Sequence, residues 1–160
     1  MNFKKILCIL PSSYESTKPQ QINTQILMKT HQTFVKVRYA ETDQMGVVHH
    51  GNYAQYLEMA RIDWLAQFDV SYRQMEKDGI MLPVYSMEFT FIKPAGFDDI
   101  LKIETRLKDF PTAKIEFGYS IYNPQEELIT RASTTLVFMD AKSKRPMRCP
   151  QYILDKIKED

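Results

Sequence analysis

The segment 38–53, which reads RYAETDQMGVVHHGNY, concentrates the side chains that could do chemistry in this sequence. Asp43 and His50 lie in it, just before Asn52, a residue type that caps helices. The free N–H groups at a helix N-terminus stabilise a developing negative charge. A carboxylate beside them can attack a carbonyl or activate water while the N–H groups hold the oxyanion. The segment therefore suggests a minimal acyl-transfer site, and the alternative is a turn carboxylate that only satisfies nearby backbone N–H groups.

A strand and a long helix flank this segment and must position it. The β-branched and aromatic run 34–39 predicts the strand. Asn52 and Gln55 have the spacing of a capping box, which predicts that the helix begins there. Apolar residues then recur at helical spacing, and Met59 and Ile62 widen the stripe, which predicts a helix buried on more than one side. The stripe consists of Tyr53, Tyr56, Leu57, Ala60, Trp64, Leu65 and Phe68.

Beyond Gly79, which is expected to end a small helix over 71–78, the apolar period changes from 3.6 to 2. Alternating runs at 84–92, 101–108, 115–121 and 128–139 predict strands, separated by turn residues, and 152–157 predicts a last amphipathic segment. In the first run Tyr85, Met87, Phe89 and Phe91 are expected to share a core-facing side, with the lining of an acyl pocket as the less favoured alternative. These patterns predict an α+β domain in which an antiparallel sheet wraps around the long helix.

Composition limits the class of protein. The 160 residues are 44% hydrophobic and carry 21 basic against 20 acidic side chains, which excludes a disordered chain and argues against a nucleic-acid partner. Residues 1–27 are expected to be a flexible N-terminal extension, upstream of the true start if Met28 is the initiator, and 28–160 the domain. No run is long enough for a secretory signal or a membrane span. Cys8 and Cys149 lack a CxxC spacing, so unpaired thiols and a cytoplasmic location are predicted.

Two blocks of this sequence resemble a known family. The first is Tyr39-x-x-Thr42-Asp43-x-x-Gly46-Val47-Val48-x-His50-x-x-Tyr53, followed by Tyr56-x-Glu58-x-x-Arg61, and the second is Phe91-Ile92-Lys93-Pro94-Ala95-x-x-Asp98-Asp99-x-Leu101. They are similar to the hotdog-fold 4-hydroxybenzoyl-CoA thioesterase family, and most to the acyl-CoA thioesterase branch encoded with bacterial Tol–Pal genes. The resemblance runs from about residue 33 to about residue 155.

The resemblance implies a hotdog fold and the hydrolysis of acyl-CoA to a free acid and coenzyme A. It implies that Asp43 acts as nucleophile or as general base on water, that the backbone N–H of His50 polarises the thioester carbonyl, and that Tyr39 lines the same site. It also implies homodimers with active sites at the subunit interface, often paired into tetramers, and no cofactor or metal.

Three further residues are candidates for substrate binding: Gly51 at the helix start, Lys93 for a coenzyme phosphate, and Glu58 because some hotdog enzymes use a helix carboxylate. Two of these residues also have a simpler interpretation. Lys93 suits a solvated loop, and Glu58 suits an ion pair with Arg61 one helical turn away.

Other functions stay open at this point. An acyl carrier protein could replace coenzyme A as the carrier, since the basic residues of 142–148 could dock it. A non-catalytic acyl-CoA-binding or dimer-scaffold module is also compatible with the fold. The adjacent His49 and His50, together with Glu41 and Asp43, could suggest a metal site, but adjacent histidines rarely share one ion and no third-ligand spacing supports it.

Overall fold

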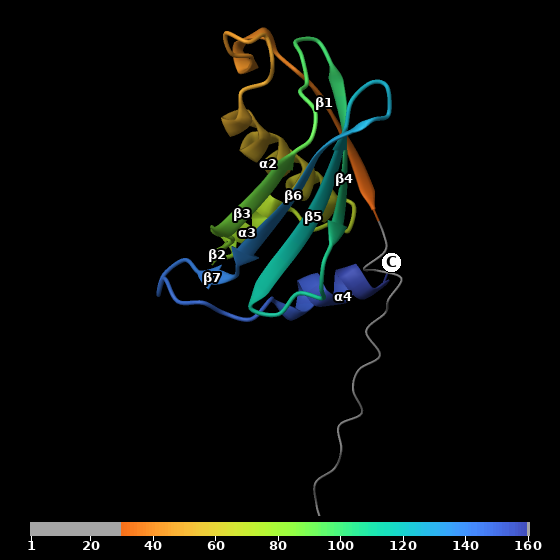
Figure 1. Cartoon of the computed structure of the whole chain (residues 1–160). Helices are drawn as coiled ribbons and strands as arrows, with labels where there is room; N and C mark the ends of the chain where they lie inside the picture. The colour runs from red at the N-terminus through yellow and green to blue at the C-terminus, as the bar shows by residue number, and fades with distance from the viewer. Residues whose placement is uncertain (1–29, 160) are drawn as a thin grey trace, which may run out of the picture.

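The computed structural model describes residues 30–159, so the expected extension 1–27 and Cys8 lie outside the described residues. One long helix and one sheet dominate the domain (Figure 1). The elements in chain order are β1 (His31–Lys36), 3₁₀ turns at Tyr39–Glu41 and His50–Asn52, α2 (Tyr53–Ala66), α3 (Tyr72–Lys77), β2 (Ile80–Met81), β3 (Val84–Phe91), β4 (Ile100–Leu107), β5 (Lys114–Tyr122), β6 (Leu128–Val137), β7 (Met139–Asp140) and α4 (Gln151–Glu159).

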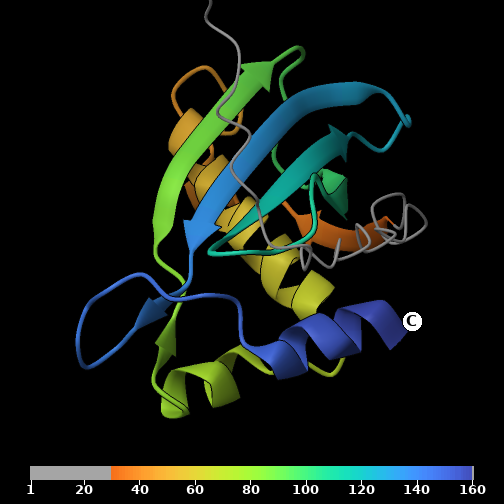
Figure 2. The same cartoon turned by 90° about the horizontal axis from the view of Figure 1, so that it is seen from below.

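The main sheet is antiparallel throughout, in the order β1-β4-β5-β6-β3, and β2 pairs separately with β7. Figure 2 shows the sheet curving over α2, with α4 across one end. The segment with the 3₁₀ turns lies at the end of the molecule opposite α4 (Figure 1). This arrangement confirms the predicted α+β fold of a sheet wrapped around a long helix. Among residues 30–159, no helix has both the length and the apolar character needed to cross a membrane.

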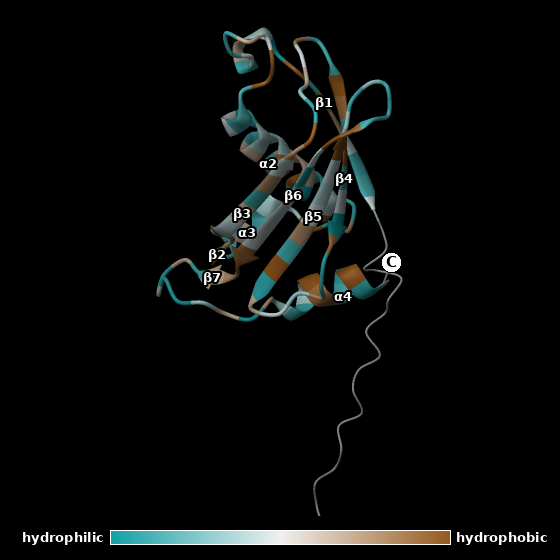
Figure 3. Ribbon diagram, viewed as in Figure 1, coloured by the Kyte–Doolittle hydropathy of each residue, from teal (hydrophilic) through white to brown (hydrophobic). Residues whose placement is uncertain are grey.

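The core forms where the stripe of α2 meets the inner face of the sheet. All seven predicted stripe residues are buried, and the Trp64 ring lies 5.3 Å from Phe117 of β5 in an edge contact. Polar and apolar residues alternate along β5 (Figure 3), and its inward-facing Ile115 and Ile121 are fully buried. Burying a large apolar side chain stabilises a fold by about 1.5–3 kcal/mol. The buried residues between α2 and the sheet therefore contribute much of the free energy that holds the helix on the sheet.

Some details near the start of the domain differ from the sequence predictions. The first strand begins at His31 and ends at Lys36, so Tyr39 lies in a 3₁₀ turn instead of a strand. The predicted capping box is wrong, because the Asn52 side chain caps no helical N–H and instead donates to the carbonyl oxygen of Glu41. Met59 and Ile62 are 50% and 36% exposed, so within this chain α2 is buried on one side only.

Strand β3 also departs from its predicted pattern. It is an edge strand, and a β-bulge between Val84 and Ser86 takes Tyr85 out of the alternation. Tyr85 is 71% exposed and Phe91 48%, so the predicted core-facing side is only half-buried at Met87 and Phe89. Apolar residues therefore remain uncovered along this edge of the chain.

Candidate active site

A tight turn presents Asp43. The backbone N–H of Asp43 donates to the Val47 carbonyl at 2.9 Å, and the Gly46 N–H donates to the Asp43 carbonyl at 2.9 Å. The Asp43 Oδ1 atom accepts the Met45 N–H at 2.8 Å, which fixes the carboxylate relative to its own turn. Gly46 has a φ of +76°, a conformation that costs other residues energy, so glycine suits this turn.

The turn is fastened to the β3–β4 connection. The Val48 N–H donates to the Ala95 carbonyl at 2.9 Å, and Val47 forms a β-bridge with Gly96. The Gly96 N–H in turn donates to Asp99 Oδ2 at 2.7 Å. The two sequence blocks that resemble the thioesterase family, far apart along the chain, are therefore held side by side.

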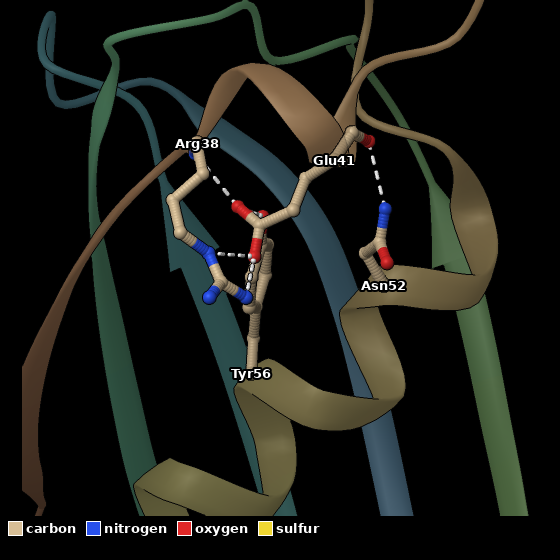
Figure 4. A network of polar contacts seen from close by, with 4 residues as sticks. All are labelled: Arg38, Glu41, Asn52 and Tyr56. Carbon is tan, nitrogen blue, oxygen red and sulfur yellow. Dashed lines mark hydrogen bonds and ion pairs between the residues drawn. The ribbon is translucent and has the colours of Figure 1, made fainter.

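A buried carboxylate ties the same segment to α2 (Figure 4). Glu41 is 5% exposed and accepts four hydrogen bonds: from the Arg38 backbone N–H at 2.7 Å, Arg38 Nε at 2.9 Å, Arg38 Nη2 at 2.6 Å and the Tyr56 hydroxyl at 2.8 Å. Its carbonyl oxygen accepts the His49 N–H at 2.9 Å and Asn52 Nδ2 at 2.7 Å. The segments on both sides of Asp43 are thus anchored through one residue.

Electrostatics keep Glu41 ionised in this position. Burial by itself raises the pKa of its carboxyl, but the hydrogen bonds from Arg38 and Tyr56 together outweigh burial and hold that pKa below its ordinary value of 4.5. Burial raises the pKa of the Tyr56 hydroxyl, and the hydrogen bond that it donates to Glu41 raises this pKa further. The hydroxyl therefore stays protonated and serves as a permanent donor.

A cavity of about 340 Å³ opens beside this turn, within the size range of small-molecule sites. Its polar side chains are Asp43, His50, Lys93 and the Tyr53 hydroxyl, and the other lining is apolar. Within residues 30–159 the backbone N–H of His50 has no acceptor, which leaves it available to a ligand. The residues that line the cavity are Asp43, Met45, Val47, Val48, His50, Tyr53, Phe91, Ile92, Lys93 and Pro94.

The cavity unites three of the predicted site residues, Asp43, His50 and Lys93, whereas the other three lie outside its lining. Tyr39 is 77% exposed and its ring packs edge-on against Phe97 at 5.6 Å. The Gly51 N–H donates to His49 Nδ1 at 3.2 Å.

Glu58 pairs with Arg61 Nη2 at 2.8 Å, as its simpler alternative reading expected. Arg61 is itself 3% exposed, with Nε and Nη1 lacking a partner in the described part of the chain.

A second cavity of about 640 Å³ lies between the β4–β5 connection and α4. It is larger, but it contains none of the predicted site residues, and Cys149 in its lining is a free thiol whose pKa burial raises to about 12. We therefore assign the chemistry to the smaller cavity. In the described part of the chain, no three His, Cys, Asp or Glu side chains gather as metal ligands would.

Four site residues have roles that the sequence patterns did not favour. Glu41 and Tyr56 position the Asp43 turn, whereas Glu41 was considered only for a metal site without supporting spacing, and Tyr56 only as a member of the core stripe and of the first family block. Phe91 and Ile92 line the cavity, which for Phe91 is the less favoured of its two predicted roles. The spacing of Arg38 and Glu41, three residues apart with opposite charges, is the one local signal that could have indicated the buried network.

Known proteins resemble this chain in sequence and in structure. The putative acyl-CoA thioesterase YneP of Bacillus subtilis (strain 168) is 35% identical over 114 residues, covering 71% of this chain and 83% of that protein. The chloroplastic acyl-acyl carrier protein thioesterase ATL3 of Arabidopsis thaliana is 30% identical over 127 residues, covering 79% and 66%. The crystal structure of a DHNA-CoA thioesterase from Staphylococcus aureus superposes with a TM-score of 0.75 at 35% identity, covering 79% of this chain and 85% of that one.

These likenesses confirm the hotdog fold that the sequence blocks implied. A model of the thioesterase-like superfamily matches residues 37–157, which include every residue that lines the Asp43 cavity. Because this match spans well over half of the sequence, the chain belongs to the thioesterase-like superfamily.

Proposed function

We propose that this protein is an acyl-CoA thioesterase, which converts acyl-CoA and water into a carboxylic acid and free coenzyme A. The observation that carries the proposal is the single cavity that brings together the Asp43 carboxylate, the partnerless N–H of His50 and the Lys93 ammonium. The similarity to the putative acyl-CoA thioesterase YneP and to the DHNA-CoA thioesterase of Staphylococcus aureus supports the same reaction class.

In this reaction Asp43 acts on the thioester carbonyl in one of two ways. Its carboxylate attacks the carbonyl carbon, or it takes a proton from a water that attacks. Negative charge develops on the carbonyl oxygen, and the His50 N–H at the start of the helical segment donates to that oxygen. When water attacks, the C–S bond breaks, the acid is released, and the coenzyme A sulfur takes the proton that Asp43 had accepted. When Asp43 attacks, breaking the C–S bond leaves an acyl–Asp43 anhydride. Water then hydrolyses this anhydride, which releases the acid, restores the carboxylate and supplies the proton that the sulfur takes up.

The remaining lining suits the two ends of such a substrate. Apolar side chains, including Phe91 and Ile92, surround the acyl portion, whereas the Lys93 ammonium at 49% exposure is placed to meet a coenzyme phosphate. Gly51, Tyr39 and Glu58 lie outside this lining, and we propose that they contribute to a site completed by a second subunit.

A homodimer is part of this proposal, with a tetramer as a further level of assembly. The support is the free edge of β3, where Val84, Tyr85, Phe91 and Ile92 are all at least 40% exposed. Exposed apolar edges of this kind tend to be covered by association. We also place the protein in the cytoplasm, which is consistent with the free thiol of Cys149.

An acyl carrier protein is the second candidate carrier. The favouring observation is the 30% identity to a chloroplastic acyl-acyl carrier protein thioesterase. Lys142, Lys144, Arg145 and Arg148 are all exposed beyond β7 and could dock an acidic carrier. Both carriers present the same thioester to Asp43, so the chemistry is unchanged.

The test is a thiol-release assay with short, long and aromatic acyl-CoA substrates and one acyl carrier protein thioester, comparing the parent with Asp43→Asn. Asparagine keeps the Oδ1 acceptor for the Met45 N–H, so the turn should persist. We expect kcat to fall about 10²–10⁴-fold, because a general base or nucleophile is removed. Asp109→Asn is the matched control, because Asp109 is exposed and residues 30–159 offer its carboxylate no hydrogen bond or ion pair.

Two results would overturn the proposal. Full activity in Asp43→Asn would remove Asp43 from the chemistry. Tight binding of acyl-CoA by the parent without hydrolysis of any substrate would identify a non-catalytic binding module.

A further inference from the structure

The cavity lysine already has an acidic partner. Lys93 Nζ lies 2.6 Å from Glu127 Oε1, a residue of the β5–β6 connection that does not itself line the cavity. The two side chains are 49% and 46% exposed, so each is within reach of solvent and of a ligand. A phosphate that binds Lys93 must therefore compete with a carboxylate that is already bound there.

Glu127 is held in place by a turn built for it. The other carboxylate oxygen, Oε2, accepts Asn123 Nδ2 at 2.9 Å, while Asn123 Oδ1 accepts the backbone N–H groups of Gln125 at 3.1 Å and Glu127 at 2.9 Å. The Lys93 hydrogen bond, followed by the Asn123 hydrogen bond, holds the pKa of the Glu127 carboxyl below its ordinary value. Glu127 therefore carries a fixed negative charge at neutral pH.

The neighbouring acid provides a contrast. Glu126 pairs with Lys102 of β4, and neither of these residues lines the cavity. Two adjacent glutamates on one turn thus form ion pairs with two different lysines, and only one of these lysines lines the cavity. This arrangement separates the local effect of a Glu127 charge on the site from the general effect of a charge on that turn.

We propose that Glu127 is an electrostatic gate on coenzyme binding, which holds Lys93 in an ion pair that the coenzyme phosphate must displace. The proposal rests on the proposed acyl-CoA substrate. In the free protein the pair neutralises the rim of the cavity, so an anion that makes no other contact gains little from Lys93. A complete coenzyme A, whose remaining parts fill the cavity, offsets the cost of breaking the pair. Glu127 thereby weakens the binding of every phosphate that uses Lys93, so only ligands that make further contacts in the cavity bind measurably.

Glu127→Gln provides the test, with Glu126→Gln as the matched control. Binding of free coenzyme A is measured by titration calorimetry, and KM and kcat are measured on the best acyl-CoA substrate. In Glu127→Gln both Kd and KM should fall about 1.4- to 5-fold with kcat unchanged, because exposed ion pairs are worth only about 0.2–1 kcal/mol. Glu126→Gln should bind as the parent does. The difference between Glu127→Gln and the parent should shrink as salt is raised, because salt screens exposed charges.

A double-mutant cycle tests whether Glu127 affects coenzyme A binding through Lys93. In a Lys93→Gln background, which should bind coenzyme A more weakly, the Glu127→Gln substitution should change Kd by less than it does in the parent. Coenzyme A lacking its 3′-phosphate distinguishes the phosphates: loss of the Glu127 effect with this ligand would assign Lys93 to the 3′-phosphate, and persistence would assign it to the diphosphate.

The gate is refuted if Glu127→Gln binds coenzyme A as the parent does or more weakly, or if Glu126→Gln tightens binding equally. Such results leave the thioesterase assignment intact, since that depends on Asp43. A parent protein that neither binds nor hydrolyses any coenzyme A ester would instead remove the proposed function.

Discussion

Replacing Glu41 with glutamine tests whether a single buried carboxylate holds the Asp43 turn against α2. Glutamine has nearly the same shape, but its amide nitrogen is a donor. It would face groups that all donate: the Arg38 N–H groups and the Tyr56 hydroxyl. The substitution therefore removes charge and acceptor capacity without opening a cavity.

The expected loss of stability depends on which of these hydrogen bonds is buried. The Tyr56 hydroxyl bond joins a side chain that is 1% exposed to one that is 5% exposed, and hydrogen bonds to charged groups contribute about 1.5–3 kcal/mol. The Arg38 side chain is 72% exposed, so water screens its pairing with Glu41 and the figure rests on Tyr56. We expect Glu41→Gln to lower the free energy of unfolding at pH 7 by about 1.5–3 kcal/mol.

The pH dependence has a definite sign. Because the folded pKa of Glu41 is lowered, its contribution is complete above the ordinary value of 4.5 and is lost as the pH falls through the lower folded value. Urea unfolding of parent and variant should therefore show a gap that is full at pH 7 and narrows below pH 4.5. Other carboxylates titrate in both proteins, so the gap isolates Glu41.

Glu116→Gln is the control, since the described residues offer its carboxylate no hydrogen bond or ion pair, and it should unfold like the parent. A Glu41→Gln gap that has the same size at pH 3.5 and pH 7 would refute the electrostatic explanation. A gap no larger than that of the control would show that the network does not stabilise the fold.

Two further predictions concern the turn and the sheet edge. Gly46→Ala should lower the free energy of unfolding by about 1–2 kcal/mol in thermal or urea unfolding. The added Cβ would meet no atom within 4 Å, so the cost is that of placing alanine at a φ of +76° alone. Unchanged stability would contradict this explanation. Tyr85→Glu on β3 should convert a dimer into a monomer in sedimentation velocity. The fold should stay intact, since Lys114 Nζ, which lies 5.1 Å from the centre of the Tyr85 ring, can pair with the new carboxylate. A dimer that persists would place the interface elsewhere.

The parts of the fold that were predictable depend on local periodicity. All seven members of the predicted stripe are buried, because side chains at helical spacing share a face whatever their partner, although the last member, Phe68, lies just beyond the end of α2. The outer margin of that helix was not predictable. Met59 and Ile62 are apolar like the core residues, but the described part of the chain leaves their side chains 50% and 36% exposed.

Among the site residues, too, those that lie close together in the sequence were predictable, whereas those brought together by tertiary contacts were not. Asp43 and His50 are near each other in sequence, so one segment was enough to suggest them. Lys93 joins them through the bonds of Val48 to Ala95 and of Val47 to Gly96, contacts between distant parts of the sequence that no local pattern predicted. Asn52 is an instructive error, because its type and spacing suited a cap but the Glu41 carbonyl competes for its amide. Which acceptor wins depends on tertiary structure that no local pattern contains.

The two edges of the sheet differ in a way that bears on assembly. Unpaired strand edges promote association, and proteins restrain it with charged side chains or by covering the edge. The β1 edge carries charged side chains: Lys36 pairs with Asp98 at 2.7 Å, and His31 and Thr33 bond to Asp63 of α2 at 3.2 and 2.8 Å, although Phe34 of this strand is 62% exposed. The β3 edge instead exposes Val84, Tyr85 and Phe91, with a bulge only at its first residues. Phe91 also lines the Asp43 cavity, so a subunit that covers this edge would lie at the cavity wall. The β3 edge is therefore the one where a second chain could both cover exposed apolar side chains and complete the site.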